Sequence, residues 1–500
     1  MAAANGRGKG RHPAVQTTDA EAQTPDVMGR HGAGAATNGG PILGHAPTSG
    51  RVVGVGAAHA GCQGESMASS STRASGPPVS AVGDPEPGAF RPVPRTGVIF
   101  VMGEATRRGF RYGHPDWANL GQGAPETGTL PGAPARIGGV TMDDDAHEYA
   151  PVGGLPALRD AVAALYNARY RRGMASQYTA ENVAISSGGR AGLTRIAAAL
   201  GNTHLGHLLP DYTAYAELLD NFRAFVPIPI VVERDAGFRL SPQALEREIA
   251  GRGIGALLFS NPCNPTGQRL GGHELAELTA VARRTRCTLI LDEFYSHYLY
   301  DHPIDNPPSE SAAACVDDVD RDPLLIIDGL TKNWRYPGWR LSWTLGPREI
   351  IARLTSAGSF LDGGPSHPLQ NAAIPLLDPA VADAEARAIQ VAFTEKRRIV
   401  LEACRRIGLV VDPAPRGAFY AFASLERLPP TLRDGSALFQ KALDHQVIVV
   451  PGRFFDVDPG GRRAHLPSRL AGFVRLSFGP SLPELRRGLE RLETLVREAG

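Results

Sequence analysis

Apolar and polar residues recur along most of the chain at two spacings, one typical of helices and one of buried strands. In residues 155–170 the apolar side chains return every three or four positions, which predicts an amphipathic helix. Short apolar runs predict strands at 183–185, 226–232, 256–259, 288–291 and 324–327, with helices between some of them, such as 191–200 and 274–286. Apolar strands separated by helices imply a mainly parallel sheet with helices on both faces.

The two ends of the chain show other patterns. Residues 1–92 are rich in Gly, Ala, Ser, Thr and Pro without a sustained period, which predicts a disordered tail. Beyond about residue 350 a long helical stretch precedes apolar runs that predict strands at 418–422, 447–450 and 473–478. We therefore predict four parts: the tail at 1–92, an N-terminal arm and part of a small domain at 93–144, a large α/β domain at 145–355, and the rest of the small α+β domain at 356–500.

Composition and charge exclude several classes of protein. The net charge is +1, from 52 basic and 51 acidic residues, so bulk electrostatics predict neither a nucleic-acid nor a membrane partner. The longest apolar runs fall short of the roughly 18 residues that a membrane span requires. Five scattered cysteines argue against a disulfide framework and favour a cytoplasmic location. His297 and His302 match no standard ligand spacing, so no metal is predicted.

Chemically useful residues follow successive predicted strands. The segment Ser-Ser-Gly-Gly-Arg at 186–190 joins a strand to a helix, where backbone N–H groups can hold a phosphate. The turn Asn-Pro-Cys-Asn-Pro-Thr-Gly at 261–267, the acid Asp292 and the amine Lys332 each follow a later strand. Each feature alone is typical of an ordinary loop. The carboxyl ends of parallel strands meet at one edge of a sheet, however, so the four predict one shared site.

This combination of groups matches the needs of pyridoxal 5'-phosphate (PLP). A phosphate requires amide donors and a cation. A pyridine nitrogen requires a carboxylate that keeps it protonated, and an aldehyde requires a lysine amine that is partly neutral. The sequence therefore predicts a PLP site in which Asp292 and Lys332 serve the ring and the aldehyde.

From about Val98 to the C-terminus the chain resembles the class I/II aminotransferases of PLP fold type I, the aspartate aminotransferase-like superfamily. Four motifs carry the resemblance in the family's order: Asn-Pro-x-Asn-Pro-Thr-Gly at 261–267, Asp-Glu-x-Tyr at 292–295, Lys332 eight residues before Arg340, and Arg475 within Val-Arg-Leu-Ser-Phe. The resemblance implies an α/β fold with a large, mainly parallel sheet and a smaller α+β domain. It also implies a transaminase that moves an amino group from an amino acid to a 2-oxo acid.

The resemblance further implies roles for single residues. Lys332 would hold the cofactor as a Schiff base and move a proton at the substrate α-carbon, Asp292 would pair with the ring nitrogen, and Tyr295 would hydrogen-bond the ring 3′-oxygen. Further cofactor contacts are implied for Gly189, Arg190, Tyr212, Asn264, Arg340 and Tyr149, the last from the neighbouring subunit of a homodimer. Substrate contacts are implied for Arg475, Gly123 and Asn264.

Two positions depart from the family pattern. Gly329 stands where relatives often have a serine that contacts the phosphate, with Thr331 nearby, and residues 334–337 form a bulky Trp-Arg-Tyr-Pro segment. Arg190 stands where some bacterial relatives have a lysine that contacts a distal carboxylate. A dicarboxylic amino donor is therefore a hypothesis, with a purely structural arginine as the alternative.

The motifs leave the outcome of the chemistry open. Because pocket residues decide which bond breaks, a lyase, a cyclising synthase and an oxidase remain alternatives to the aminotransferase. A transcription regulator with an aminotransferase-like domain would need an N-terminal helix-turn-helix domain. Residues 1–92 show no helical period and no basic recognition helix, which argues against it.

Overall fold

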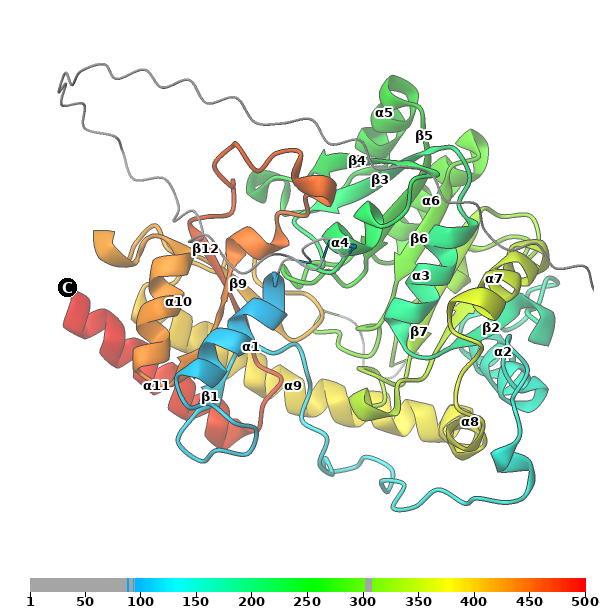
Figure 1. Ribbon diagram of the computed structural model, residues 1–500, viewed down its shortest axis with the longest axis horizontal. Coiled ribbons are helices and arrows are strands. Elements are labelled where there is room, and N and C mark those ends of the chain that lie inside the picture. Colours follow the sequence, from blue (N-terminus) through cyan, green and yellow to red (C-terminus); the bar gives the residue numbers. More distant parts are fainter. Residues whose placement is uncertain (1–87, 90–92, 94, 302–307) are drawn as a thin grey trace, which may run out of the picture. The chain divides into compact units, whose positions relative to one another are not determined.

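A seven-stranded sheet forms the centre of the larger part of the molecule (Figure 1). The computed structural model describes residues 88–89, 93, 95–301 and 308–500, and its helices and strands belong to one compact unit, Ala89–Gly500. The predicted tail at 1–92 therefore lies almost wholly outside the described residues. The sheet contains β2 (Val183–Ser186), β3 (His204–Leu209), β4 (Val226–Val231), β5 (Ile254–Ser260), β6 (Thr288–Asp292), β7 (Leu324–Gly329) and β8 (Ser342–Leu345).

The strand order is β2-β8-β7-β6-β5-β3-β4, and β8 runs antiparallel to both of its neighbours while the other pairs are parallel. This confirms the predicted mainly parallel sheet, because β4 to β7 lie where the apolar runs placed them. β3 and β8 were not predicted. β8 brings its backbone so close to Gly329 that a Cβ there would lie 2.6 Å from the Cα of Ser342.

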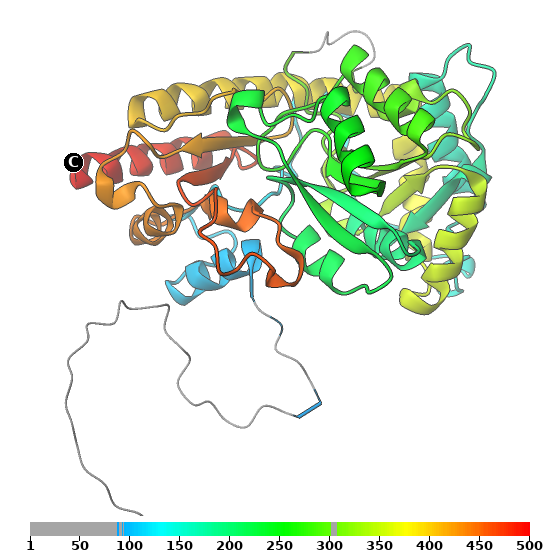
Figure 2. The same cartoon turned by 90° about the horizontal axis from the view of Figure 1, so that it is seen from above.

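Helices cover both faces of this sheet (Figures 1 and 2). They are α2 (Pro156–Tyr170), α3 (Gly189–Ala199), α4 (Tyr215–Asp220), α5 (Pro242–Arg252), α6 (His273–Thr285), α7 (Arg348–Leu361) and α8 (His367–Ala373). The predicted helix at 155–170 is confirmed by α2, which begins with a proline whose missing N–H costs nothing at that position. Its predicted apolar stripe is buried, Leu158 and Val162 fully so. Apolar spacing alone was sufficient to locate this helix.

A second group of elements combines the N-terminal segment with the C-terminal third of the chain. β9 (Tyr420–Ser424), β12 (Phe473–Ser477) and β11 (Val450–Pro451) form an antiparallel sheet, and β1 (Ala118–Asn119) pairs in parallel with β10 (Val447–Ile448). The helices here are α1 (Gly97–Arg107), α9 (Pro379–Ile407), α10 (Gly435–Asp444) and α11 (Leu482–Ala499). The pairing of β1 with β10 supports joining 93–144 to 356–500, although the boundaries themselves remain predictions.

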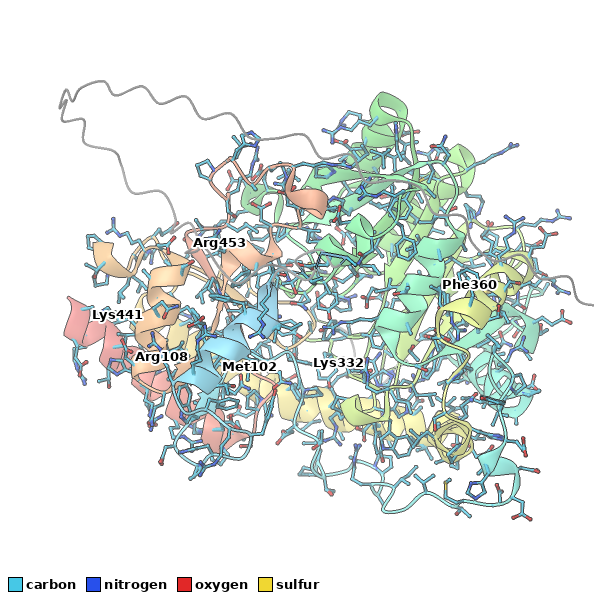
Figure 3. All side chains as sticks on the ribbon, in the orientation of Figure 1. Met102, Arg108, Lys332, Phe360, Lys441 and Arg453 are labelled. Carbon is cyan, nitrogen blue, oxygen red and sulfur yellow. The ribbon has the colours of Figure 1, made fainter. Side chains whose placement is uncertain are left out.

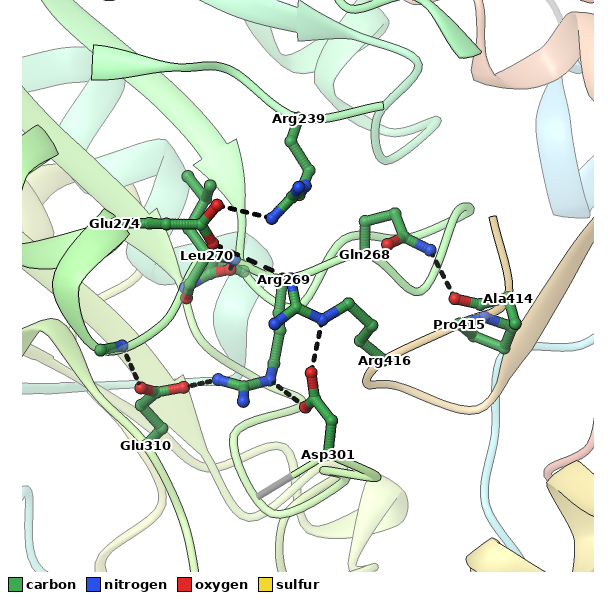
Figure 4. A network of polar contacts seen from close by, with 12 residues as sticks. Arg239, Gln268, Arg269, Leu270, Glu274, Asp301, Glu310, Ala414, Pro415 and Arg416 are labelled. Atoms are coloured by element: carbon green, nitrogen blue, oxygen red, sulfur yellow. Dashed lines mark hydrogen bonds and ion pairs between the residues drawn. The ribbon is translucent and has the colours of Figure 1, made fainter. Parts of the chain in front are cut away.

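A polar network fastens the turn at 261–267 to the segment that leads into β9 (Figure 4). Arg269 is buried and pairs with Asp301 at 2.7 Å and with Glu310. Asp301 also accepts a hydrogen bond from Arg416, whose own backbone N–H donates to the Gly267 carbonyl at 2.8 Å. Charge pairs near the surface contribute little singly, but shared partners reduce the entropy lost for each pair. The network therefore fixes the turn that carries Asn264 relative to β9.

Candidate active site

The carboxyl ends of three neighbouring strands meet at one edge of the large sheet. In the parallel pairs, Ser260 of β5 lies beside Asp292 of β6, and Asp292 lies beside Ile327 of β7. The turn 261–267 and Lys332 follow directly from these strand ends. The structure thus brings together the three motifs that the sequence placed after separate strands, as the geometry of parallel sheets requires.

Lys332 faces the N-terminal segment from the end of β7, and Figure 3 labels it near the boundary between the large sheet and the C-terminal elements. Its Nζ donates a hydrogen bond to the Gly123 carbonyl oxygen. Loss of surrounding water, followed by the positive charges of Arg475, Arg340 and Arg190, lowers the pKa of Lys332 from 10.5 to about 7, against the opposing effect of Asp292. An amine with this pKa is partly neutral near pH 7 and can act as a nucleophile.

Asp292 is buried at the end of β6. Its Oδ2 accepts a hydrogen bond of 2.8 Å from the hydroxyl of Tyr215 in α4. Burial raises the pKa of Asp292 to about 6, while Tyr215 and the charge of Lys332 act in the opposite direction. A cation placed against this carboxylate would favour its ionised form, and in return the carboxylate would hold a proton on that cation. Asp292 is therefore suited to a protonated ring nitrogen.

Arg475 is a buried cation without an acidic partner among the described residues. It lies in β12 with 1% of its surface exposed. Its Nη1 donates to Asn264 Oδ1 at 2.8 Å, its Nη2 donates to the Gly121 carbonyl, and its Nε has no hydrogen-bond partner within the described residues. A buried charge without a counterion is unfavourable in the free protein, so this guanidinium is prepared for an anionic ligand.

A second group of residues that could bind an anion lies at the amino end of α3. Gly188 has a φ of +90°, and a Cβ there would lie 2.4 Å from Arg340 Nη2, so only glycine lets this guanidinium approach the turn. The helix follows at once with Gly189. Thr331 directly precedes Lys332 in the chain. Its Oγ1 is buried and lacks a hydrogen-bond partner among the described residues. Backbone N–H groups, a guanidinium and an unpaired hydroxyl fit a phosphate.

Tyr212 and Arg190 form a pair beside this cradle. Arg190 donates from Nε and Nη2 to the Tyr212 hydroxyl, at 3.2 and 2.9 Å. Because both donors engage one oxygen, the fork of the guanidinium is not closed on a carboxylate. Tyr212 is itself fixed by its backbone N–H, which donates to Asp211 Oδ1 at 2.7 Å. Arg190 is therefore held in place with donors left for a further acceptor.

Taken together, these groups fit PLP. The described residues offer an amine at Lys332, a carboxylate at Asp292 and a phosphate cradle at the start of α3. Tyr295 completes the set, since its hydroxyl lies 2.7 Å from the hydroxyl of Tyr420 beside Gly123. Among the described residues no cluster of side chains could hold a metal ion, and His302 lies outside them.

Some predicted residues do not meet the others, and some neighbours were missed. Tyr149 is 97% exposed, so within one chain it contacts none of the site. Tyr215 and Tyr420 were not predicted. The bulky segment at 334–337 packs against other elements, since Trp334 donates to the Leu376 carbonyl at 2.9 Å and Arg335 pairs with Glu385 at 2.7 Å.

The comparisons with known proteins agree with this geometry. The family model "Aminotransferase class I and II" matches residues 115–492. An aspartate aminotransferase of Streptomyces avermitilis is 27% identical over 71% of this chain and 82% of its own length. An aspartate/prephenate aminotransferase of Thermus thermophilus is 28% identical over 70% of this chain and 84% of its own. The solved structure of the Thermus thermophilus aspartate aminotransferase with maleate superposes with a TM-score of 0.65 and 25% identity, covering 82% of this chain and 98% of that one.

Proposed function

Because this chain belongs to the class I and II aminotransferases, we propose that it takes its amino group from a dicarboxylic amino acid, with Lys332, Asp292 and Arg475 at the centre of the reaction. It is a PLP-dependent aminotransferase, which moves an amino group from an amino acid to a 2-oxo acid. The relatives are named as transaminases, so their names do not support the elimination, cyclisation or oxidation that the motifs alone left open. The observation that carries the proposal is a pair of guanidinium groups, Arg475 and Arg190, which both lower the pKa of Lys332 and have no ion-pair partner among the described residues.

Bound PLP supplies an aldehyde that reacts with amines and a ring that accepts electrons from the substrate α-carbon. Lys332 Nζ would hold the cofactor and then move the proton at the substrate α-carbon. Asp292 would keep the proton on the ring nitrogen. Arg475 would bind the substrate α-carboxylate with its planar fork, and the backbone of Gly123 would contact the same carboxylate.

The remaining site residues would orient the cofactor. Asn264 accepts from Arg475 through Oδ1, which leaves its Nδ2 as the atom that can donate to the ring oxygen together with the Tyr295 hydroxyl. Tyr212 would lie against the ring face. Arg340 and the N–H groups of Gly189 and Arg190 would bind the phosphate. Thr331 is proposed to replace the serine that the family has at Gly329, because its hydroxyl is buried and unpaired among the described residues.

The pH dependence of cofactor attachment tests the role of Lys332. Only the neutral amine attacks an aldehyde, and the neutral fraction of a base rises as the pH rises through its pKa. With a pKa of about 7, the rate at which apoprotein acquires covalently bound PLP is expected to rise about tenfold between pH 6 and pH 8 and then level off. Stopped-flow absorbance measures this rate. A rate that still climbs steeply above pH 9 would contradict the assignment.

Arg190 is the residue proposed to recognise the distal carboxylate. In the Arg190→Gln variant we expect kcat/KM for glutamate and aspartate to fall about 10- to 100-fold, the value of one charged hydrogen bond or a pair of them, while kcat/KM for alanine is unchanged. The backbone N–H of residue 190 stays in place for the phosphate. Coupled assays with each donor measure the ratio. An equal loss for all three amino acids would favour the structural alternative.

We also propose a homodimer in which Tyr149 reaches the phosphate of the neighbouring subunit. Tyr149 is 97% exposed and Phe360 75% exposed. Their segments are neighbours, because a Cβ at Gly364 would lie 3.2 Å from Val152 Cα, and the Gly364 carbonyl lies 3.5 Å from Ser187 Oγ at the phosphate cradle. Exposed aromatic side chains beside a binding site are typical of an interface.

Sedimentation velocity tests the dimer. The unmodified protein is expected at twice the mass of one chain, and the Phe360→Asp variant at the mass of one chain, because an interfacial carboxylate would lose its water on association. The matched control is Leu466→Asp, which changes another exposed apolar residue, 55% exposed, in the segment before β12 rather than in α7. A monomeric unmodified protein would contradict the proposal.

A cytoplasmic location is proposed on the state of the cysteines. The four cysteines within the described residues are free thiols, as expected in a reducing compartment. In the same part of the chain, no helix has both the length and the apolar character needed to cross a bilayer.

A further inference from the structure

Tyr420 lies inside the site, although nothing in the motifs marks it. It is the first residue of β9 and is fully buried. The Arg475 guanidinium lies 4.4 Å above its ring centre, and its hydroxyl lies 2.7 Å from the hydroxyl of Tyr295. A Cβ at Gly123 would lie 2.5 Å from the same hydroxyl. The side chain of Tyr420 therefore contacts Arg475, which is proposed to bind the substrate, through its ring. Through its oxygen it contacts Tyr295, which is proposed to bind the cofactor.

We propose that Tyr420 is a positioning residue that directs the Tyr295 hydroxyl proton toward the cofactor ring oxygen. This inference rests on the role proposed above for Tyr295. The Tyr420 hydroxyl acts as the donor and the Tyr295 oxygen as the acceptor, so that Tyr295 keeps its own proton for the cofactor.

The hydrogen-bond inventory sets this direction. A tyrosine hydroxyl has one proton to donate and lone pairs to accept with. In the pair Tyr295–Tyr420 one hydroxyl donates to the other. If Tyr295 donated to Tyr420, it would have no proton left for the ring oxygen of the cofactor. A Tyr295 that serves the cofactor must therefore accept from Tyr420.

Packing fixes the ring of Tyr295 but leaves the rotation of its O–H bond for Tyr420 to set. The Tyr295 ring is held edge-on by Phe419, at 5.4 Å between ring centres, and by Tyr298, at 6.4 Å. Packing of this kind fixes the ring but not the rotation of the O–H bond. A hydroxyl that accepts a hydrogen bond also becomes a stronger donor, because bonds in a chain polarise one another. Tyr420 thus orients the Tyr295 proton and strengthens its bond.

The pH midpoint of the bound cofactor's absorbance tests this inference without measuring activity. A hydrogen bond to the ring oxygen draws negative charge from it, so the proton on the nitrogen that joins cofactor and lysine is held less firmly. Losing the bond raises the midpoint. We expect Tyr295→Phe to raise it by about one pH unit and Tyr420→Phe by roughly a third of that, the share due to polarisation and orientation.

The double variant shows whether Tyr420 acts through Tyr295. If it does, Tyr295→Phe combined with Tyr420→Phe has the midpoint of Tyr295→Phe alone. The matched control is Tyr300→Phe, which removes a phenol that donates to the Ala418 carbonyl close to β9 but outside the site. The Tyr300→Phe holoenzyme is expected to have the same pH midpoint as the unmodified holoenzyme.

A second measurement separates positioning from packing. The dissociation constant for maleate, which has carboxylates but no amino group, is expected to stay within about twofold in Tyr420→Phe, because phenylalanine keeps the ring beneath Arg475. A tenfold weaker maleate binding would show that the site has collapsed, and it would overturn the inference.

The outcomes distinguish a failure of the role proposed for Tyr295 from a failure of the role proposed for Tyr420. No shift in Tyr295→Phe means that the role proposed for Tyr295 is wrong. A shift in Tyr295→Phe without a shift in Tyr420→Phe leaves that role standing and overturns the inference about Tyr420. Additive shifts in the double variant overturn it as well, because Tyr420 would then act independently of Tyr295.

Discussion

Replacing Lys332 with alanine is expected to remove covalent attachment of the cofactor and to lower kcat/KM by at least about 10⁴-fold. Two functions are lost together, the amine that holds the aldehyde and the base that moves the proton at the substrate α-carbon, and proton transfer alone contributes about 10²- to 10⁴-fold. No other amine is placed to replace it among the described residues, since the lysine of α9, Lys396, is engaged with Glu126 and two backbone carbonyls.

The composition of the chain makes this experiment unusually clean. The sequence contains only four lysines, Lys9, Lys332, Lys396 and Lys441. Reduction of the holoprotein with borohydride, followed by digestion and mass spectrometry, is expected to place the cofactor on the peptide that contains Lys332. The control variant is Lys441→Ala, which changes an exposed lysine of α10 and should leave the labelled peptide unchanged. Label on any other lysine of the unmodified protein would refute the assignment.

The strands that the sequence could locate are those with an uninterrupted apolar run. β5, β6 and β7 are buried on both faces, so almost every residue in them is apolar, and each appears close to its predicted bounds. β3 was missed because His204 and His207 interrupt it. β8 was missed because its four residues, Ser342–Leu345, alternate in polarity and follow the cofactor loop at once. Pairing with neighbours, rather than local propensity, makes these two segments strands.

The candidate site divides in the same way. Lys332, Asp292, Asn264 and Arg475 lie in motifs whose spacing can be read from the chain. The structure brings the first three to one edge of the large sheet, and Arg475 of β12 donates to Asn264 from the smaller sheet. Tyr215 and Tyr420 have no such signal, because an aromatic residue in an apolar run is typical of a core position. Their hydroxyl partners lie 77 and 125 residues away along the chain. Only the tertiary arrangement of β6, α4 and β9 gives these residues a role.

Arg475 is expected to show opposite effects on function and stability. In Arg475→Gln, kcat/KM is expected to fall about 10³-fold, because two charged hydrogen bonds to the substrate α-carboxylate are lost at about 1.5–3 kcal/mol each. Burial lowers the pKa of Arg475, which means that the protein interior disfavours its charged form. Removing that charge is therefore expected to raise the unfolding midpoint of the apoprotein by about 1–3 °C.

Two further variants locate the origin of both effects. Arg475→Lys keeps the charge but loses the planar fork, so it is expected to recover only part of kcat/KM and to gain no stability. Arg427→Gln changes an exposed arginine after β9 and should leave both quantities unchanged. Differential scanning calorimetry of the apoproteins and steady-state kinetics of the holoenzymes measure the two quantities. If Arg475→Gln lowers the unfolding midpoint by several degrees, the guanidinium is compensated in the free protein, and its buried charge is not held in readiness for the substrate carboxylate.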